Sequence, residues 1–274
     1  MNGDPTWRGL ALDGAAALAL LEWQAEFGVD EAILDSPQDR FEEAQRPAPV
    51  APAVAAPPPA AKPAQPDEPD RAAVMAEAMA LAARAQSLPE LAELQQGFDG
   101  IELKKGALNF VFSDGNPKAR LLILGEAPGN DEDAQGKPFV GRAGQLLDRM
   151  LAAIGLDRHS PDAERAAYIT NVLAWHPPGN RRPTDAEIAL SLPFVRRHIE
   201  LADPDVIVLM GNTPCKAALG REGILKLRGN WTEAFGKPAL PMTHPAYLLR
   251  TAIAKREAWA DLLAVAARLD LPPV

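Results

Sequence analysis

Hydrophobic positions in the second half of the chain form short runs separated by longer amphipathic stretches. Four runs have the length and apolar character of buried strands, and turn residues bound each of them: 119–125, 166–172, 205–211 and 239–245. Helical patterns lie between them, around residues 143–154, 184–201 and 214–220. This alternation predicts an α/β fold, a three-layer α/β/α sandwich around a central, mainly four-stranded parallel sheet.

The first hundred residues follow a different pattern. Apolar residues at helical spacing over residues 9–27 predict a short helix within an acidic N-terminal segment, 1–45. Residues 46–70 are rich in Pro and Ala and contain no aromatic residue, which is typical of a disordered, solvated linker. Alanine-rich sequence that favours helix continues over residues 71–98. We therefore expect a helical and disordered N-terminal extension before a folded domain at 71–274.

Polar residues and glycines follow the predicted strands. The first strand runs into Gly125 and Glu126, the second ends on Asn171, the third runs into Gly211, and the fourth delivers His244. Each has an ordinary structural explanation by itself, as a turn, a cap or a hydrogen-bonded residue. Ligands of open parallel sheets bind beyond the carboxyl ends of the strands, so the convergence of these residues on one rim predicts a ligand site there.

Charge and cysteine content narrow the classes of partner. The formal net charge is -9, but residues 1–100 hold 6 Lys and Arg against 17 Asp and Glu, whereas residues 101–274 hold 22 against 20. The back of the chain is therefore compatible with a nucleic acid partner. The single cysteine, Cys215, excludes a disulfide within the chain. Without an apolar run of about 18 residues or a signal-peptide pattern, we expect a cytoplasmic protein with no membrane partner.

Four segments carry a resemblance to a known family. The segments "GEAPGNDEDAQGKPFVGRAGQLLDRML", "YITNVLAWHPPGNRRPT", "DPDVIVLMGNTPCKAALG" and "MTHPAYLLR" together resemble the uracil-DNA glycosylases, specifically their fourth family. The resemblance covers about residues 95–270. It implies a DNA-repair hydrolase that flips uracil out of DNA and cleaves its N-glycosidic bond, leaving an abasic site. DNA containing uracil is then the expected partner.

The resemblance also assigns substrate-binding residues. Phe139 matches the aromatic residue on which uracil stacks, and Asn171 matches the amide that reads its pairing edge. Backbone around Gly125 and Glu126 is expected to line the pocket. Without the resemblance, Phe139 would be taken for a core residue.

Catalytic roles follow in the same way. His244 matches the donor that stabilises the negative charge on the leaving uracil. Ala127 stands where related families carry an aspartate, so the resemblance gives water positioning to Glu132 and Asn180. The alternative for Glu132 is an exposed charge in a polar loop.

The segment after His244 is expected to contact the DNA itself. By resemblance, Tyr247, Leu248 and Leu249 are candidates for an apolar wedge in the minor groove, with Arg250 on a phosphate. The alternative is that the leucines begin the last helix and face the core.

One departure from the family concerns its cofactor. The fourth family typically holds a four-iron, four-sulfur cluster on four cysteines. The corresponding positions in this chain are Phe98, Ile101, Trp175 and Ser191, and none is a cysteine. We therefore expect no cluster, no metal and no other cofactor, and we expect Cys215 to be a core residue.

Two other functions remain open at this level. The first is a non-catalytic damaged-DNA-binding protein descended from a glycosylase, although retention of Phe139, Asn171, Asn180 and His244 favours an enzyme. The second is a nucleotide- or phosphate-binding protein, but "GEAPGNDEDAQG" lacks the lysine of a P-loop. The N-terminal extension is expected to recruit a protein partner; folding back on the domain, screening DNA from weak sites and being a dispensable tail are the alternatives.

Overall fold

The computed structural model describes residues 6–7, 10–11 and 68–271. Residues 65–274 belong to one compact unit built around a six-stranded sheet of order β3-β5-β4-β6-β8-β7. The strands are β3 (Ser113–Gly115), β4 (Leu121–Gly125), β5 (Ala167–Asn171), β6 (Val206–Met210), β7 (Thr232–Ala234) and β8 (Lys237–Met242). The inner four strands pair in parallel, which confirms the predicted parallel sheet. Each edge carries an antiparallel strand too short to be recognised in the sequence pattern.

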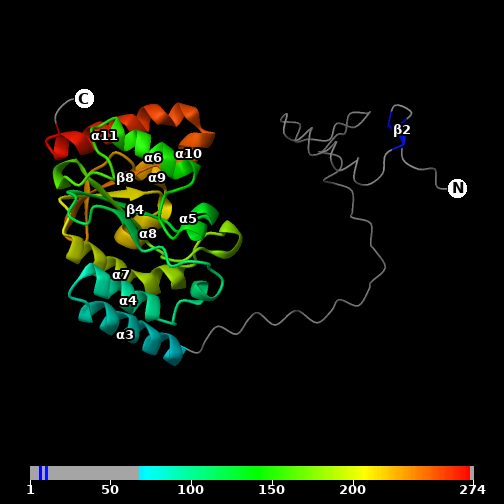
Figure 1. The fold of residues 1–274 in the computed structure, drawn as a ribbon, viewed down its shortest axis with the longest axis vertical. Coiled ribbons are helices and arrows are strands. Elements are labelled where there is room, and N and C mark those ends of the chain that lie inside the picture. The colour runs from blue at the N-terminus through cyan, green and yellow to red at the C-terminus, as the bar shows by residue number, and fades with distance from the viewer. Residues whose placement is uncertain (1–5, 8–9, 12–67, 272–274) are drawn as a thin grey trace, which may run out of the picture. The chain divides into compact units, whose positions relative to one another are not determined.

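Helices cover both faces of the sheet, as Figure 1 shows. On one face lie α6 (Arg142–Ala152), α10 (Pro245–Arg250) and α11 (Lys255–Arg268). On the other lie α7 (Asp185–Ala202) and α8 (Asn212–Leu219), with α3 (Glu68–Arg84) and α4 (Leu88–Gly97) packed against α7. The predicted three-layer α/β/α arrangement is confirmed.

The side chains of β4 show how the two core layers form. Leu122 and Leu124 pack into the cluster beneath α7, and Leu121 and Ile123 pack into the cluster beneath α6 and α11. All four are at most 2% exposed. Because successive side chains of a strand point to opposite faces, a strand covered on both sides must be apolar at every position. This is why the sequence shows continuous apolar runs instead of alternation.

Short elements complete the unit between the strands and the larger helices. They are the α-helices α5 (Asn130–Gln135) and α9 (Ile224–Leu227), and 3-10 turns at Glu102–Lys105, Ala163–Arg165, Pro178–Asn180 and Ala252–Ala254. The turn at Pro178–Asn180 and helix α5 both follow strand ends, so they lie where the ligand site is expected. None of the helices in the described ranges is long and apolar enough to cross a membrane.

Two predictions about the N-terminal region need correction. Leu10 and Ala11 form strand β2 (Leu10–Ala11), which pairs with β1 (Thr6–Trp7), so the helix predicted from residue 9 is wrong at these positions. The helical spacing of apolar residues gives no indication that two short neighbouring segments pair as antiparallel strands. The predicted linker is wrong at its end, because residues 68–70 form the first turn of α3, where a proline such as Pro69 is tolerated. The rest of the predicted helix and linker lies outside the described residues.

Candidate active site

A cleft at the predicted rim opens at the carboxyl ends of three parallel strands. It has a volume of about 1140 Å³ and receives residues that follow β4, β6 and β8. Several predicted site residues line it, together with the loop before α7 and the start of α10: Glu126, Glu132, Phe139, Asn180, His244, Tyr247 and Arg250. Gly125 and Asn171 do not line the cleft, but Gly125 lies close to both Asn171 Oδ1 and the ring of Phe139, which does. The structure therefore brings the residues predicted from separate strands to one site.

Phe139 and His244 form the centre of the site. Their rings are stacked with centroids 5.3 Å apart and an angle of 25° between the planes. Phe139 is 5% exposed and also contacts the end of β4: a Cβ added to Gly125 would lie 2.5 Å from its ring and 2.2 Å from Asn171 Oδ1. Only glycine allows the aromatic ring and the amide to approach the strand end so closely.

The surroundings of His244 determine its protonation. Its Nδ1 accepts a hydrogen bond from the Ala246 backbone N–H at 3.1 Å, at the start of α10. Burial, with a smaller contribution from the Arg250 charge, lowers the pKa of His244 to about 4. The ring is therefore neutral at pH 7, and its single proton is on Nε2 because Nδ1 is an acceptor. The site thus contains a neutral imidazole N–H donor.

Asn171 presents a buried polar atom without a partner. Its side chain is 6% exposed, and Oδ1 accepts no hydrogen bond within the described part of the chain. A buried, unpaired amide oxygen is uncommon because desolvation without a hydrogen bond costs about 1–3 kcal/mol. A ligand with an N–H group beside Phe139 would remove that cost.

Glu132, for which the resemblance implies water positioning, is bound to the backbone on both sides of its own loop. Its Oε1 accepts hydrogen bonds from the Val140 and Gly141 N–H groups at 3.0 and 2.9 Å, and Oε2 accepts from the Gly129 N–H at 3.1 Å. Glu132 is half-buried, so the alternative of a free, exposed charge is wrong. These contacts join α5 to the loop that carries Phe139, and they occupy both carboxylate oxygens.

Two further cleft residues flank this loop. Asn180 is exposed at the end of its 3-10 turn and has a left-handed backbone conformation, which asparagine tolerates (φ 53°). The Glu126 carboxylate accepts a hydrogen bond from the Thr213 hydroxyl at 2.6 Å, and the carbonyl oxygens of Gly125 and Glu126 accept from backbone N–H groups just after β5. The backbone predicted to line the pocket is therefore fixed by neighbouring elements.

The predicted DNA wedge needs one correction. Leu248 is 1% exposed and packs with Leu146 and the start of α11, so it is a core residue and cannot enter DNA in this conformation. The helical register of α10 turns Leu248 inward and Leu249 outward, and Leu249 is 38% exposed. Tyr247 and the exposed Arg250 line the cleft.

The four positions that correspond to cluster ligands in the resembled family do not fit an iron–sulfur cluster. Phe98, Ile101 and Trp175 are at most 3% exposed and belong to one hydrophobic cluster. The Phe98 ring packs on Phe194 of α7, with centroids 5.5 Å apart. Ser191 is fully buried on α7, and its hydroxyl has no partner among the described residues. None of these residues supplies a thiolate, and the buried Cys215 lies elsewhere on α8.

Sequence reasoning missed several residues that build the site. Arg158 and Gly144 hold the backbone of Phe139, and Thr213 binds Glu126. His176, which is 8% exposed, donates from Nδ1 to the Pro128 carbonyl at 2.8 Å and fixes the turn after β4. All but Gly144 act on partners at least 19 positions away, so no local pattern marked them; Gly144 in "GRAG" was visible as a glycine at the start of a helix.

Comparison with known proteins points to the same family as the sequence segments do. The family model described as "Uracil DNA glycosylase superfamily" matches residues 112–263, which include all the residues that line the cleft. The type-4 uracil-DNA glycosylase of Thermotoga maritima is 41% identical over 145 residues, 52% of this chain and 72% of that protein. The type-4 uracil-DNA glycosylase of Saccharolobus solfataricus is 35% identical over 183 residues, 63% of this chain and 82% of that protein. That of Archaeoglobus fulgidus is 47% identical over 110 residues, 40% of this chain and 52% of that protein.

Proposed function

Because the chain belongs to the uracil DNA glycosylase superfamily, we propose that it flips uracil out of DNA and hydrolyses the N-glycosidic bond, leaving an abasic site. The observation that carries this proposal is the group formed by Phe139, His244 and Asn171 at the rim where the parallel strands end. It offers an aromatic face, an N–H donor and an unpaired amide oxygen. These are the features that a uracil base requires of a pocket.

Each group has a defined task in this reaction. The flipped base stacks on Phe139, and the Asn171 amide pairs with uracil N3–H and O4. When the bond between N1 and C1′ breaks, the electron pair stays on uracil, and the neutral Nε2–H of His244 donates to O2, where negative charge develops. A donor placed in this way contributes roughly 3 kcal/mol to lowering the barrier. Water then adds to C1′, and the proton that it loses is balanced by protonation of the uracil anion, so the products are free uracil and an abasic site.

Two polar residues of the cleft are candidates for orienting the attacking water. Glu132 and Asn180 both line the cleft, but the Glu132 oxygens already accept three backbone hydrogen bonds. Asn180 has an exposed side chain at the mouth of the cleft. We propose that Asn180 orients the water and that Glu132 contributes mainly by holding the loop between α5 and α6.

Basic residues around the cleft support DNA as the ligand. Arg181, Arg182, Lys216, Lys226 and Arg250 all line it. Arg181 is paired with Glu187, and Lys216 with Asp185 and Glu222. Within residues 68–271, Arg182, Lys226 and Arg250 have no ion-pair partner, so their charges are available for phosphates. Tyr247 and Leu249 remain the candidates for the wedge that fills the gap left by the base.

We also propose that excision requires no iron–sulfur cluster. Phe98, Ile101 and Trp175 belong to one hydrophobic cluster, the fourth position holds the buried Ser191, and none of the four residues provides a sulfur ligand. The purified protein should therefore contain no stoichiometric iron or acid-labile sulfide, and excision should survive dialysis against a chelator. Iron bound in proportion to activity would contradict this part of the proposal.

The deciding experiment is cleavage of a labelled oligonucleotide with one deoxyuridine, followed by alkali. Wild type should cleave it, and His244→Ala should lose about 10²–10³-fold in rate. His159→Ala is the matched control, because His159 is exposed and outside the cleft. Binding of uracil DNA without cleavage by the folded wild type would support the alternative, a damaged-DNA-binding protein.

Two predictions concern features outside the described site. The first is that the acidic N-terminal extension recruits a protein partner. This proposal is contradicted if deletion of residues 1–70 changes neither the protein interactions nor the kinetics of excision. Cytoplasmic location also stays a prediction, to be checked by fractionation of cells that produce the tagged chain.

A further inference from the structure

The backbone of Phe139 adopts a conformation that it does not favour by itself. Its φ angle is 54°, in the left-handed region that bulky residues rarely occupy. Such a conformation persists only where the surroundings hold it. One such surrounding is helix α6, which packs directly against the Phe139 backbone. Only glycine at position 144 permits this packing, because a Cβ there would lie 1.7 Å from the Phe139 carbonyl oxygen.

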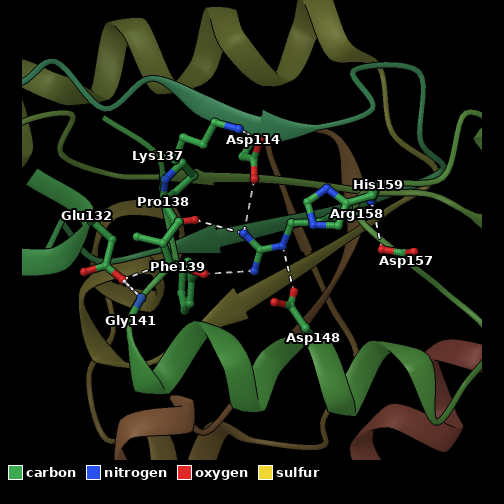
Figure 2. A network of polar contacts seen from close by, with 11 residues as sticks. Asp114, Glu132, Lys137, Pro138, Phe139, Gly141, Asp148, Asp157, Arg158 and His159 are labelled. Carbon is green, nitrogen blue, oxygen red and sulfur yellow. Dashed lines mark hydrogen bonds and ion pairs between the residues drawn. The ribbon is translucent and has the colours of Figure 1, made fainter. Parts of the chain in front are cut away.

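Arg158 binds the same backbone from the side. Its guanidinium donates to the Pro138 carbonyl and to the Phe139 carbonyl, both at 3.0 Å, as Figure 2 shows. The two acceptors belong to consecutive residues, so the planar fork of arginine fixes the orientation of both peptide groups. A lysine has no such fork and cannot reproduce the pair of contacts.

The position of Arg158 is itself determined by two acidic residues. Its Nε donates to Asp148 Oδ1 of α6 at 2.7 Å, and a terminal nitrogen lies 3.4 Å from Asp114 Oδ2 of β3. Arg158 is 4% exposed, and a buried guanidinium is stable only with such partners. The residue therefore connects β3, α6 and the loop that carries Phe139.

The opposite edge of the loop is bound by Glu132. It accepts from the Val140 and Gly141 N–H groups, so carbonyls are held on one side and amides on the other (Figure 2). With both edges of the loop bound, the Phe139 ring is stacked against His244.

We propose that Arg158 is a positioning residue for base excision, which keeps the Phe139 ring in the orientation on which the flipped base stacks. The proposal deepens the proposed function and rests on it. Arg158 does not line the cleft, so it acts on the step after DNA has bound and not on DNA binding itself.

The test compares Arg158→Lys with Arg120→Lys. Arg120 also binds two carboxylates and one backbone carbonyl, those of Glu164, Asp205 and Leu269, but at the opposite end of β4 from the site. Three quantities are measured for each variant and for wild type: the single-turnover excision rate, the affinity for an undamaged duplex and the melting temperature. Both variants should melt at lower temperature. Only Arg158→Lys should excise more slowly, by roughly 10- to 100-fold, with unchanged affinity for the undamaged duplex.

A second arm tests whether Arg158 acts through Phe139. Arg158→Lys is introduced into Phe139→Leu, which already lacks the ring, and its effect on the excision rate should then be much smaller than in wild type. An equally large effect in both backgrounds would overturn the proposal. So would equal excision rates in Arg158→Lys and Arg120→Lys, or a parallel loss of affinity for undamaged DNA.

If Arg158→Lys does not fold, the excision rate of Asp148→Asn is measured in its place. Asp148→Asn weakens the Nε contact while the guanidinium stays, and the Asp148 side chain is 46% exposed. It should lower the excision rate several-fold, and an unchanged rate would overturn the proposal. A wild type that excises no uracil would overturn both this inference and the proposed function. Excision by wild type with an unaffected Arg158→Lys would overturn the inference alone.

Discussion

Close approaches between single residues set the geometry of the candidate site. Gly125 lets Phe139 and Asn171 converge on the end of β4, and Gly144 admits the Phe139 carbonyl against α6. The neutral His244 stacks on the same aromatic ring as a preorganised donor. A methyl group added at Gly125 or a proton added to His244 should therefore affect catalysis directly.

Gly125→Ala tests the first of these approaches. The added Cβ would lie 2.2 Å from Asn171 Oδ1 and 2.5 Å from the Phe139 ring, so both must move. We expect a loss of excision rate of roughly 10- to 100-fold, from displacement of groups that contact the base. Gly97→Ala is the matched control, because its Cβ would have no neighbour within 4 Å, and it should excise at the wild-type rate. Normal single-turnover rates in Gly125→Ala would show that the close approach is not required.

The pH dependence of excision tests the state of His244. Its pKa is lowered to about 4, so it stays neutral as pH falls from 8 to about 5. Below about pH 5, His244 begins to take up a proton on Nδ1, the atom that accepts the Ala246 N–H hydrogen bond. Because this hydrogen bond is then lost, activity should fall as pH passes through about 4. The single-turnover rate should therefore be flat across the neutral range, in wild type and in His159→Ala. If the excision rate fell with a midpoint near the ordinary histidine pKa of about 6.5, the lowered pKa assigned to His244 would be contradicted.

At the scale of elements, the start of α7 fixes one wall of the cleft. Thr184 Oγ1 accepts from the Glu187 N–H at 3.3 Å, and the Glu187 carboxylate accepts from the Thr184 N–H at 2.7 Å, which forms a capping box. Glu187 also binds Arg181 in the preceding loop. The cap thus connects the loop that carries Asn180 to the helix that covers the sheet.

Thr184→Ala should lower the free energy of unfolding by about 1 kcal/mol, because the Glu187 N–H in the first turn of α7 loses its acceptor, the Thr184 hydroxyl. Urea unfolding measures the change. Thr251→Ala is the control, since Thr251 precedes a 3-10 turn and makes no capping hydrogen bond with its side chain. Equal unfolding midpoints for the two variants would mean that the cap contributes nothing.

At the scale of the whole molecule, the sheet separates two apolar clusters, and one of them contains a buried polar group. His198 of α7 is 4% exposed, stacks on Phe112 and hydrogen-bonds the Tyr168 hydroxyl at 2.9 Å. Burial lowers the pKa of His198 to about 3 and raises that of Tyr168 to about 12. Both groups are therefore neutral in the folded protein over the physiological range.

Acid should destabilise the protein through His198. The unfolded chain binds a proton at this residue below about pH 6.5, and the folded protein does not until about pH 3. The contribution of neutral His198 to the free energy of unfolding is fully present above pH 6.5. As pH falls below that value, the free energy of unfolding decreases by about 1.4 kcal/mol per pH unit. Between pH 7.5 and 5, His198→Gln should lose less of its free energy of unfolding than wild type does. His159→Gln, at an exposed position, should follow the wild type, and equal losses in all three proteins would exclude His198 as the cause.

The sequence by itself determined the parallel sheet and the end of it that carries the site. Continuous apolar runs are the consequence of strands covered on both faces, and chain direction places their carboxyl ends together. The positions of Gly125, Phe139, Asn171 and His244 at one rim followed from these two facts and from the family motifs. The edge strands were too short, and their exposure too mixed, to leave such a pattern.

Only the tertiary structure decided how the rim residues are held. The left-handed backbone of Phe139 depends on Arg158, which reaches it across 19 residues of sequence, and Leu248 is buried because α10 packs on α6. Glu132 differs, because its three amide partners lie only three to nine positions away and one of them, the Gly129 N–H, belongs to the capping box of its own helix. Local periodicity records which side of an element faces the core, but it cannot record side-chain hydrogen bonds between elements that are distant in sequence.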